Sequence, residues 1–255
     1  LVGMEETGIR LDVDFLRRMS AELAEEIAGL EAEIYRLAGE RFNIQSPQQL
    51  GTILFDKLKL PAGKKTKKTK SYSTGAETLE ELAAAGHELP QYLLRYRELA
   101  KLKSTYVDAL PQIVGGDGRV HTRFQQAVAA TGRLSSVNPN LQNIPIRTEL
   151  GMKIRRAFCA APGALLVAAD YSQIELRVLA HIAGEKAMIE AFASGEDIHR
   201  STAATVLGLS VDFVNAEQRR AAKTINFGLI YGMSAYGLAQ ALGIDAKLAA
   251  HIEAT

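Results

Sequence analysis

Apolar side chains recur at spacings of four and three residues through the first part of the chain, which is the period of one face of an α-helix. The first run lies between Asp12 and Gly39 and predicts one long helix that ends at the glycine. A second helix is predicted to begin with Ser46 as its N-cap and Pro47 at its first helical position. Helical spacing returns further along, so residues 1–112 are predicted to be mostly helical.

The pattern changes after the GGDG sequence at residues 115–118. The next stretch, RVHTRFQQAV, alternates in the manner of a half-buried strand and predicts the start of a sheet. ALLVAAD, with its small and branched side chains, predicts a buried strand that ends at Asp170, and IELRVLAHIAG predicts a helix that ends at Gly184. Further helices are predicted to begin near Asp197, Asn215 and Ala235.

Two polar segments are predicted to be loops. TGRLSSVNPNLQNIP is rich in Ser, Asn, Gly and Pro, which predicts an ordered loop with many hydrogen-bonding side chains. KKTKKTKSYST, between Gly63 and Gly75, holds five lysines and no apolar residue to pack, which predicts a solvated loop. Such a basic tip either contacts phosphates or is a flexible, solubilising loop, and the residues alone leave both readings open.

Composition narrows the class of protein. At 255 residues and 47% hydrophobic content, the chain is long enough to bury a core. It has no apolar run long enough for a membrane span, and Leu1–Arg10 lacks the order of a signal peptide. The single cysteine, Cys159, excludes an internal disulfide and fits a reducing compartment, so we expect a cytoplasmic protein. The net charge is only +1, so an anionic partner must be argued from where the charges lie.

Asp170 is the first candidate for chemistry, because a predicted strand fixes its backbone and the polar YSQ that follows lets the chain turn away. Magnesium takes oxygen ligands of this kind, with substrate phosphates completing its shell. An aspartate at the end of a strand can also simply cap the next helix. Taken alone, the position of Asp170 does not distinguish a magnesium ligand from a helix cap.

A stronger signal is EQRRAAKTINFGLIYG, where Arg219, Lys223 and Phe227 fall at i, i+4 and i+8, with Tyr231 four residues further on. On a helix these side chains lie along one stripe. Two cations followed by two aromatic rings suit a polyphosphate at one end and a base with its sugar at the other. The alternative is a solvated basic turn that runs into apolar core. Gly228 counts against that alternative, because glycine within a helix costs about 1 kcal/mol relative to alanine.

DYSQIELR followed by RRAAKTINFGLIYG resembles the polymerase domain of family A DNA polymerases, the bacterial DNA polymerase I type. The resemblance implies an α+β fold of right-hand architecture, with a helical thumb, an antiparallel-sheet palm and helical fingers, truncated before the palm is complete. It implies a thumb-like helical region with a basic tip and the start of the palm at 1–118. The palm with the strand bearing Asp170 follows at 119–184, and partial fingers at 185–255.

By this resemblance Asp170 and the carbonyl of Tyr171 would bind magnesium in a two-metal site, and Asp170 and Lys223 would be catalytic. Glu175 would close the sugar pocket against a 2′-hydroxyl, or be a solvated acid paired with Arg177 or Arg219. His199 would add a triphosphate contact, or be an ordinary residue at a helix start. Phe227 in place of tyrosine should disfavour nucleotides that lack the 3′-hydroxyl. The implied nucleotide-binding set is Tyr171, Gln173, Glu175, His199, Arg219, Lys223, Phe227 and Tyr231.

The resemblance also implies contacts with DNA. Side chains near the primer end would sense the minor-groove acceptors that every base pair presents; they are Arg133, Asn140, Gln142 and Asn143. The basic tip would contact phosphates through Lys64, Lys65, Lys67, Lys68 and Lys70, with binding that weakens as salt rises.

The function implied is template-dependent addition of deoxynucleotides to a primer 3′ end, by a monomer whose partners are primer–template DNA and deoxynucleoside triphosphates. The family supplies a second metal-binding carboxylate from a late His-Asp-Glu hairpin, and no His-Asp pair occurs in this sequence. We therefore expect an inactive fragment of a polymerase, with exonuclease domains absent from this stretch. The alternative is a noncatalytic module that binds duplex DNA. Glu175 disfavours a third possibility, the related single-subunit RNA polymerases.

Overall fold

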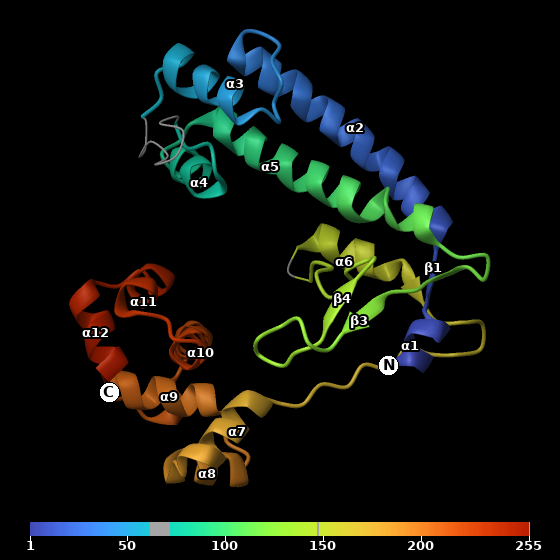
Figure 1. The fold of residues 1–255 in the computed structure, drawn as a ribbon. Helices are drawn as coiled ribbons and strands as arrows, with labels where there is room; N and C mark the ends of the chain where they lie inside the picture. Colours follow the sequence, from blue (N-terminus) through green and yellow to red (C-terminus); the bar gives the residue numbers. More distant parts are fainter. Residues whose placement is uncertain (62–71, 147, 255) are drawn as a thin grey trace. The chain divides into compact units, whose positions relative to one another are not determined.

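Residues 1–61, 72–146 and 148–254 are described in the computed structural model (Figure 1). The chain divides into two units, Leu1–Val167 and Ala168–Thr255, and each is considered by itself. The described residues are mostly helical, with a small amount of antiparallel sheet. None of the helices in this part of the chain combines the length and the apolar character that crossing a membrane requires.

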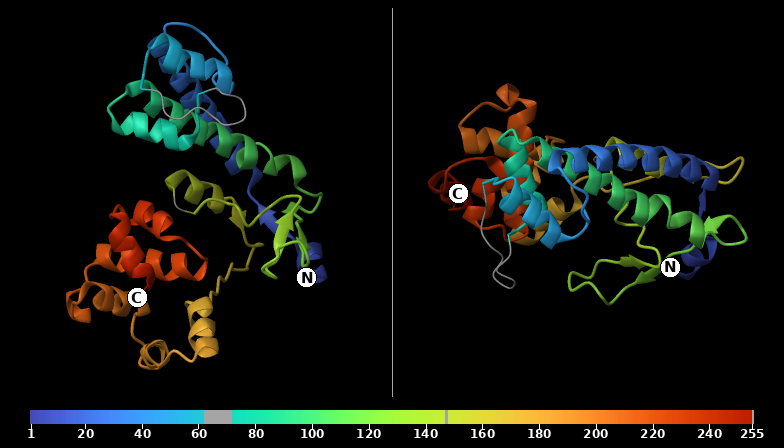
Figure 2. Two further views of the ribbon diagram at one scale, coloured as in Figure 1. Left: turned by 60° about the vertical axis from the view of Figure 1, so that its left-hand side comes forward. Right: turned by 90° about the horizontal axis from the view of Figure 1, so that it is seen from above.

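Two long helices, α2 (Val13–Ala38) and α5 (Glu88–Leu102), lie side by side in the first unit (Figures 1 and 2). α2 begins where Asp12 accepts a hydrogen bond from the backbone N–H of Phe15 at 2.9 Å. It ends at Gly39, whose φ of 71° is the left-handed conformation that glycine adopts without steric cost. The prediction of one long helix between Asp12 and Gly39 is confirmed.

A small helical cap covers one end of this pair. It consists of α3 (Pro47–Gly51), a π-helical turn (Thr52–Lys57) and α4 (Ala76–Ala84). Ser46 accepts the capping bond at the start of α3, as its position before proline predicted. Apolar side chains from the cap and from both long helices form one buried cluster, which includes Ile34, Leu50, Leu54, Leu79 and Leu93.

Two small sheets lie near the other end of the two long helices, α2 and α5. β1 (Ile9–Leu11) follows α1 (Val2–Thr7) and lies between two antiparallel partners, β2 (Arg119–Val120) and β5 (Phe158–Cys159). β3 (Arg123–Gln125) pairs with β4 (Ser135–Val137) in a separate two-stranded sheet. The remaining elements here are a π-helical turn (Lys103–Val107), a 3-10 turn (Leu110–Ile113) and α6 (Glu149–Arg156).

The single strand predicted for RVHTRFQQAV is only partly right. The chain breaks after Val120, and the two halves, β2 and β3, join different sheets. The break falls at His121 and Thr122, whose side chains make hydrogen bonds with groups outside the strands.

Helices are the only regular secondary structure in the described part of the second unit. Its elements are α7 (Ile174–Ala183), α8 (Lys186–Ala193), α9 (Ile198–Leu207), a 3-10 turn (Val211–Phe213), α10 (Ala216–Ile230), α11 (Ala235–Leu242) and α12 (Ala246–Ala254). Asp197 and Asn215 cap α9 and α10, and Gly184 ends α7, as predicted. Asn215 and Gln218 form a reciprocal capping box, so the start of α10 is fixed by local hydrogen bonds.

The buried strand predicted to end at Asp170 is wrong. Residues 164–170 have no regular secondary structure, and Leu165 and Val167 are 89% and 88% exposed. The apolar run has the composition of a buried strand, but a strand also needs a hydrogen-bonding neighbour. Among the described strands none pairs with this segment. Asp170 therefore lies in exposed coil and not at the rim of a sheet.

Candidate functional site

The stripe predicted from the sequence is present on α10. Arg219, Lys223 and Phe227 lie on this helix, and Tyr231 is its C-cap residue. Residues four apart on a helix stand one above another, so the cations occupy the first part of the helix and the aromatic rings its end. The sequence prediction of one helix carrying this order of side chains is confirmed; the role of each residue stays a prediction.

Asp197 holds the cationic end of the stripe against α9. Its Oδ2 accepts a hydrogen bond from Nε of Arg219 at 2.6 Å, and its Oδ1 accepts from the backbone of His199 at 3.0 Å. Burial alone would raise the pKa of Asp197, but the bonds from Arg219 and from the helix backbone outweigh it and lower the pKa. One carboxylate thus caps α9 and orients a guanidinium on α10. Lys223, one turn further on, is exposed.

The aromatic end of the stripe is a short row of rings. The centroids of Phe227 and Tyr231 lie 6.5 Å apart with an interplanar angle of 15°, and His199 lies 5.8 Å from Phe227. The hydroxyl of Tyr231 donates a hydrogen bond to the carboxylate of Glu175 in the first turn of α7. The fold therefore gathers side chains from α7, α9 and α10 around Phe227.

His199 is almost completely buried, at 2% exposure, and is not an ordinary exposed residue of a helix start. Its Nδ1 lies 3.1 Å from Nδ2 of Asn226 on α10. Burial lowers the pKa of His199, Arg219 and Lys223 lower it further, and Asp197 acts in the opposite direction. The ring is consequently held neutral at physiological pH.

Asn226 was missed by the sequence predictions, although a signal for it exists. It lies inside α10 between Ile225 and Phe227, where the helix packs. Asparagine is a poor residue for a helix interior because its amide competes with the backbone for hydrogen bonds. A partly buried polar residue of this kind usually has a specific partner, and here the partners are His199 and Thr202.

The residues around the predicted metal site are exposed. Asp170 lies in coil and Tyr171 is 81% exposed. Gln173 is the N-cap of α7 with a φ of 53° and makes no side-chain capping bond, so Asp170 does not cap that helix. Within residues 1–61, 72–146 and 148–254, no three His, Cys, Asp or Glu side chains are close enough together to hold a metal ion.

The four side chains predicted to contact DNA are exposed on the two segments that flank β4. Arg133 precedes the strand, and Asn140, Gln142 and Asn143 lie in the loop that follows it. The buried hydroxyls of Thr122 and Ser136 hold the loop that follows β4 in place. Oγ1 of Thr122 and Oγ of Ser136 lie 2.7 Å apart. The carbonyl oxygen of Pro139 lies within hydrogen-bonding distance of both hydroxyls, 2.8 Å from Thr122 and 3.1 Å from Ser136.

The loop is also tied to the helices of the first unit, because the hydroxyl of Tyr106 donates to the carbonyl of Asn143 at 2.5 Å. Asn140, Gln142 and Asn143 therefore stand on an anchored segment of backbone, which is the arrangement that a preformed binding surface needs. The lysines predicted to contact phosphates, Lys64, Lys65, Lys67, Lys68 and Lys70, lie outside the described residues.

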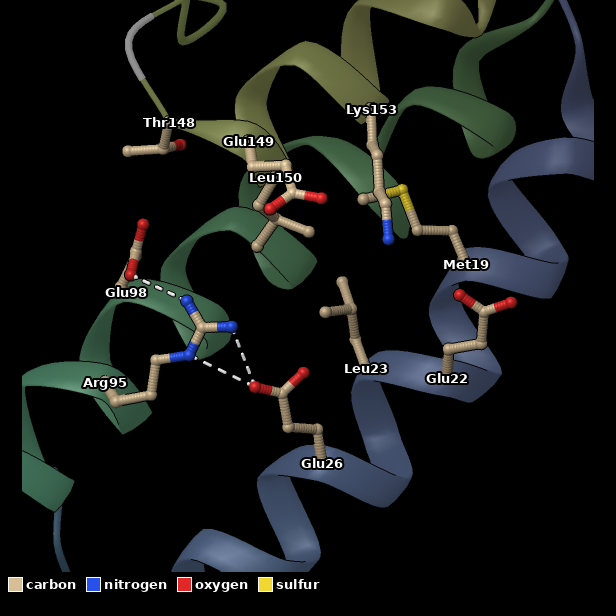
Figure 3. Close-up of a pocket in the computed structure, with 10 residues that line it drawn as sticks. All are labelled: Met19, Glu22, Leu23, Glu26, Arg95, Glu98, Thr148, Glu149, Leu150 and Lys153. Carbon is tan, nitrogen blue, oxygen red and sulfur yellow. Dashed lines mark hydrogen bonds and ion pairs between the residues drawn. The ribbon is translucent and has the colours of Figure 1, made fainter.

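A cavity of about 180 Å³ lies between α2, α5 and α6 in the first unit (Figure 3). Arg95 bridges Glu26 and Glu98 across it, at 2.8 and 3.1 Å. With Glu22 and Glu149 also lining the cavity, carboxylates outnumber the two cations, Arg95 and Lys153. Such a charge balance disfavours a polyphosphate, and none of the residues predicted to act in catalysis lines this cavity. The ion pair of Arg95 with Glu26 instead connects α5 to α2 across this cavity.

Comparison with known proteins gives consistent matches along the chain. The family model described as DNA polymerase family A matches residues 13–255. The thermostable DNA polymerase I of Thermus aquaticus is 58% identical over 245 residues, which is 96% of this chain and 29% of the relative. DNA polymerase I of Geobacillus stearothermophilus is 56% identical over 252 residues, 98% of this chain and 28% of the relative. The chain thus spans less than a third of these relatives.

A solved structure matches as well. It is the polymerase domain of Pol1 from M. smegmatis in complex with a DNA primer-template and dNTP. The TM-score is 0.87 at 44% sequence identity, and the match covers 98% of this chain and 44% of that one.

Proposed function

The chain belongs to DNA polymerase family A, and on that premise we propose that it supplies the nucleotide-binding helix and a duplex-binding loop of a DNA-directed DNA polymerase. Its substrates would be deoxynucleoside triphosphates and a primer–template duplex. The observation that carries the proposal is the stripe on α10, where two cations precede two aromatic rings on one face.

Arg219 and Lys223 would bind the triphosphate of the incoming nucleotide. Nucleotidyl transfer is accelerated mainly by positioning and by fixed charge next to the nonbridging oxygens. Asp197 favours this role, because a guanidinium held by a 2.6 Å bond is already oriented before the nucleotide arrives. Lys223 is exposed and would add a mobile positive charge one turn along the helix.

Phe227, Glu175 and Tyr231 would form the sugar and base end of the site. Phe227 would pack against the sugar, where it would disfavour nucleotides without a 3′-hydroxyl, and Tyr231 would lie beside the templating base. Glu175 would exclude the 2′-hydroxyl of ribonucleotides, and the bond from Tyr231 supports this role by holding the carboxylate near the ring of Phe227. Gln173 and Tyr171 would border the same site at the start of α7.

Magnesium is the metal that the family resemblance implies, with Asp170 and the carbonyl of Tyr171 as its ligands in this chain. The described residues do not fit a closed metal centre, because Asp170 lies in exposed coil without two further ligating side chains nearby. The two-metal reaction is therefore assigned to no set of residues in this chain.

The two segments that flank β4, which carry Arg133, Asn140, Gln142 and Asn143, would bind the minor groove of the duplex near the primer end. The support is that all four side chains are exposed, and that Thr122 and Ser136 anchor the backbone of the segment after β4 at Pro139. Donors on a fixed backbone can test the geometry of any base pair through acceptors common to all of them. The lysine-rich tip would add contacts with phosphates.

Nucleotide binding to the purified chain tests the proposal. A labelled primer–template is bound first. The next correct deoxynucleotide is then titrated, and the amount of nucleotide that the complex retains is measured. Arg219→Ala and Lys223→Ala should each weaken retention, and Arg220→Ala is the matched control, since this exposed neighbour leaves the stripe intact. Equal retention by all four proteins would overturn the proposal.

The second candidate function is a noncatalytic module that binds duplex DNA, and the anchored loop is the observation that favours it. The same titration separates the two functions. A module of this kind would bind duplex with no preference for a primer end and would not retain the nucleotide.

A further inference from the structure

Three polar side chains form a hydrogen-bonded relay between α9 and α10. His199 is 2% exposed, and Asn226 and Thr202 are partly buried beside it. Nδ2 of Asn226 lies 3.0 Å from Oγ1 of Thr202 and 3.1 Å from Nδ1 of His199. From this geometry we propose that Asn226 is a positioning residue, which fixes His199 in the neutral tautomer with its proton on Nε2.

The direction of the relay follows from Thr202. Its hydroxyl has one hydrogen, and this is donated to the carbonyl of Ile198 at 2.8 Å. Oγ1 can therefore only accept from its other neighbour, Asn226. The amide of Asn226 must present its NH₂ group to Thr202, because its oxygen would bring two acceptors together.

The same NH₂ group faces His199. An amide nitrogen donates and cannot accept, so Nδ1 of His199 must accept, and an accepting ring nitrogen carries no proton. The neutral imidazole then carries its proton on Nε2. Asn226 thus donates to both His199 and Thr202. The orientation of its amide is fixed by Thr202, whose Oγ1 can only accept.

The charges around the ring agree with a neutral histidine. Asp197 faces it from the N-cap of α9, and Arg219 and Lys223 face it from α10. Burial and the two cations lower the pKa of His199, and Asp197 offsets only part of this. A second proton on Nδ1 would also lose the hydrogen bond from Asn226.

Nε2 is left as an available donor. In the described part of the chain no buried side-chain polar atom lacks a partner, and the one side-chain hydrogen bond of His199 is at Nδ1. Nε2 is therefore not completely enclosed, although the residue as a whole is 2% exposed. His199 can donate one hydrogen bond from Nε2 to an anion beside Arg219 and Lys223. Because the ring is neutral, this bond does not require a change in its charge.

This inference rests on the proposed function where it names the ligand, a phosphate oxygen of the incoming nucleotide. Because the pKa of His199 is lowered, a neutral ring with a fixed Nε2–H would donate at neutral pH and above. A hydrogen bond from a neutral donor to a charged oxygen would strengthen nucleotide binding roughly tenfold.

The tautomer is tested by two-bond ¹H–¹⁵N correlation of the purified chain labelled with ¹⁵N-histidine. His199→Gln assigns the signal among the five histidines. We expect one Nε2–H tautomer at neutral pH and above. Asn226→Asp should place the proton on Nδ1 and raise the pKa of the ring, because a carboxylate accepts from Nδ1–H. Thr202→Ser, which keeps the hydroxyl, should leave the spectrum unchanged, while Thr202→Val should mix the tautomers.

An Nδ1–H tautomer in the parent chain, or an unchanged spectrum in a folded Asn226→Asp variant, would overturn the inference. Circular dichroism establishes that each variant folds. The phosphate contact has its own readout, because His199→Gln should lower retention of the nucleotide roughly tenfold. Unchanged retention together with the expected tautomer would reject the role of His199 in the proposed function and leave the positioning by Asn226 standing.

Discussion

The hydroxyl of Tyr231 donates a hydrogen bond to the carboxylate of Glu175, across a sequence separation of 56 residues. The bond connects the C-terminal end of α10 with the first turn of α7. A carboxylate held in this way has less freedom to turn away from a neighbouring ligand. Two residues that were predicted to act separately, one on the sugar and one on the template base, are thus physically coupled.

In a polymerase that contains this segment, Glu175→Ala should admit ribonucleotides. Tyr231→Phe should relax the same discrimination to a smaller degree, because it keeps the ring and removes only the hydrogen bond that orients Glu175. Incorporation of ribonucleotides relative to deoxynucleotides measures both effects. Continued exclusion of ribonucleotides by Glu175→Ala would reject the gate.

Lys223→Ala and Arg133→Ala should impair different steps of extension in the same polymerase. Loss of the exposed cation on α10 should raise KM for the nucleotide and lower kcat by a factor of roughly ten or more, since the triphosphate loses a charge contact. Loss of Arg133 should mainly slow extension from the primer end. Steady-state kinetics with varied nucleotide and varied primer–template separates them, and an unaltered Lys223→Ala enzyme would make the stripe structural.

Acid should weaken the contact between Asp197 and Arg219. The lowered pKa of Asp197 means that its stabilising effect is present above about pH 4 and is lost as the pH falls through the folded-state value. Because both side chains are partly exposed, the ion pair contributes about 1 kcal/mol or less.

Asp197→Asn should keep the cap of α9 and lose the ion pair, whereas Asp197→Ala should lose both and cost about 1 kcal/mol more. Urea unfolding at pH 7 and at pH 3.5 measures the difference. A parent chain whose stability relative to Asp197→Asn does not change with pH would contradict this account.

His121 should hold α1 in place most firmly at low pH. Nδ1 faces the carbonyl of Glu5 at 2.8 Å and Nε2 faces the carboxylate of Asp117 at 3.0 Å, so both ring nitrogens can donate when the ring is protonated. The hydrogen bond to Glu5 and then the one to Asp117 raise the pKa of His121, while Arg119 acts against them.

With a raised pKa, the contribution of His121 is complete below about pH 6.5 and is lost as the pH rises through the folded-state value. Hydrogen exchange of the α1 amides, corrected for its intrinsic pH dependence, should therefore become faster above neutrality. His121→Gln should remove the pH dependence, and a parent chain whose α1 amides exchange at one corrected rate throughout would count against it.

We expect the 255-residue chain not to extend a primer, even with magnesium and all four deoxynucleotides. Asp170 lies in exposed coil, and a metal held by one carboxylate is poorly positioned, which should cost several powers of ten in rate. Primer extension followed by gel electrophoresis measures this. Template-dependent extension that Asp170→Ala abolishes would show that other residues of this chain complete the site.

The helices were predictable from the sequence because their ends are decided locally. The helices predicted to end at Gly39 and to begin near Asn215 have these ends in the structure, and Asp12 and Asn215 form side-chain caps at the starts of their helices. The strand predicted to end at Asp170 was wrong because pairing depends on a distant neighbour, which the composition of one segment cannot supply. The contacts of Tyr231 with Glu175 and of Asn226 with His199 also depend on how whole helices pack, so only the candidate residues, and not their partners, could be named in advance.

The apolar stretch that precedes Asp170 also governs how the chain will behave toward proteases. Cleavage requires a peptide that can adopt an extended shape in the enzyme's active site, and Leu165 and Val167 lie in exposed chain without regular secondary structure. The stretch contains the junction of the two units, at Val167 and Ala168. A brief digestion with an enzyme that cuts after leucine would therefore separate the chain at this junction, yielding the anchored loop and the α10 stripe as two distinct fragments.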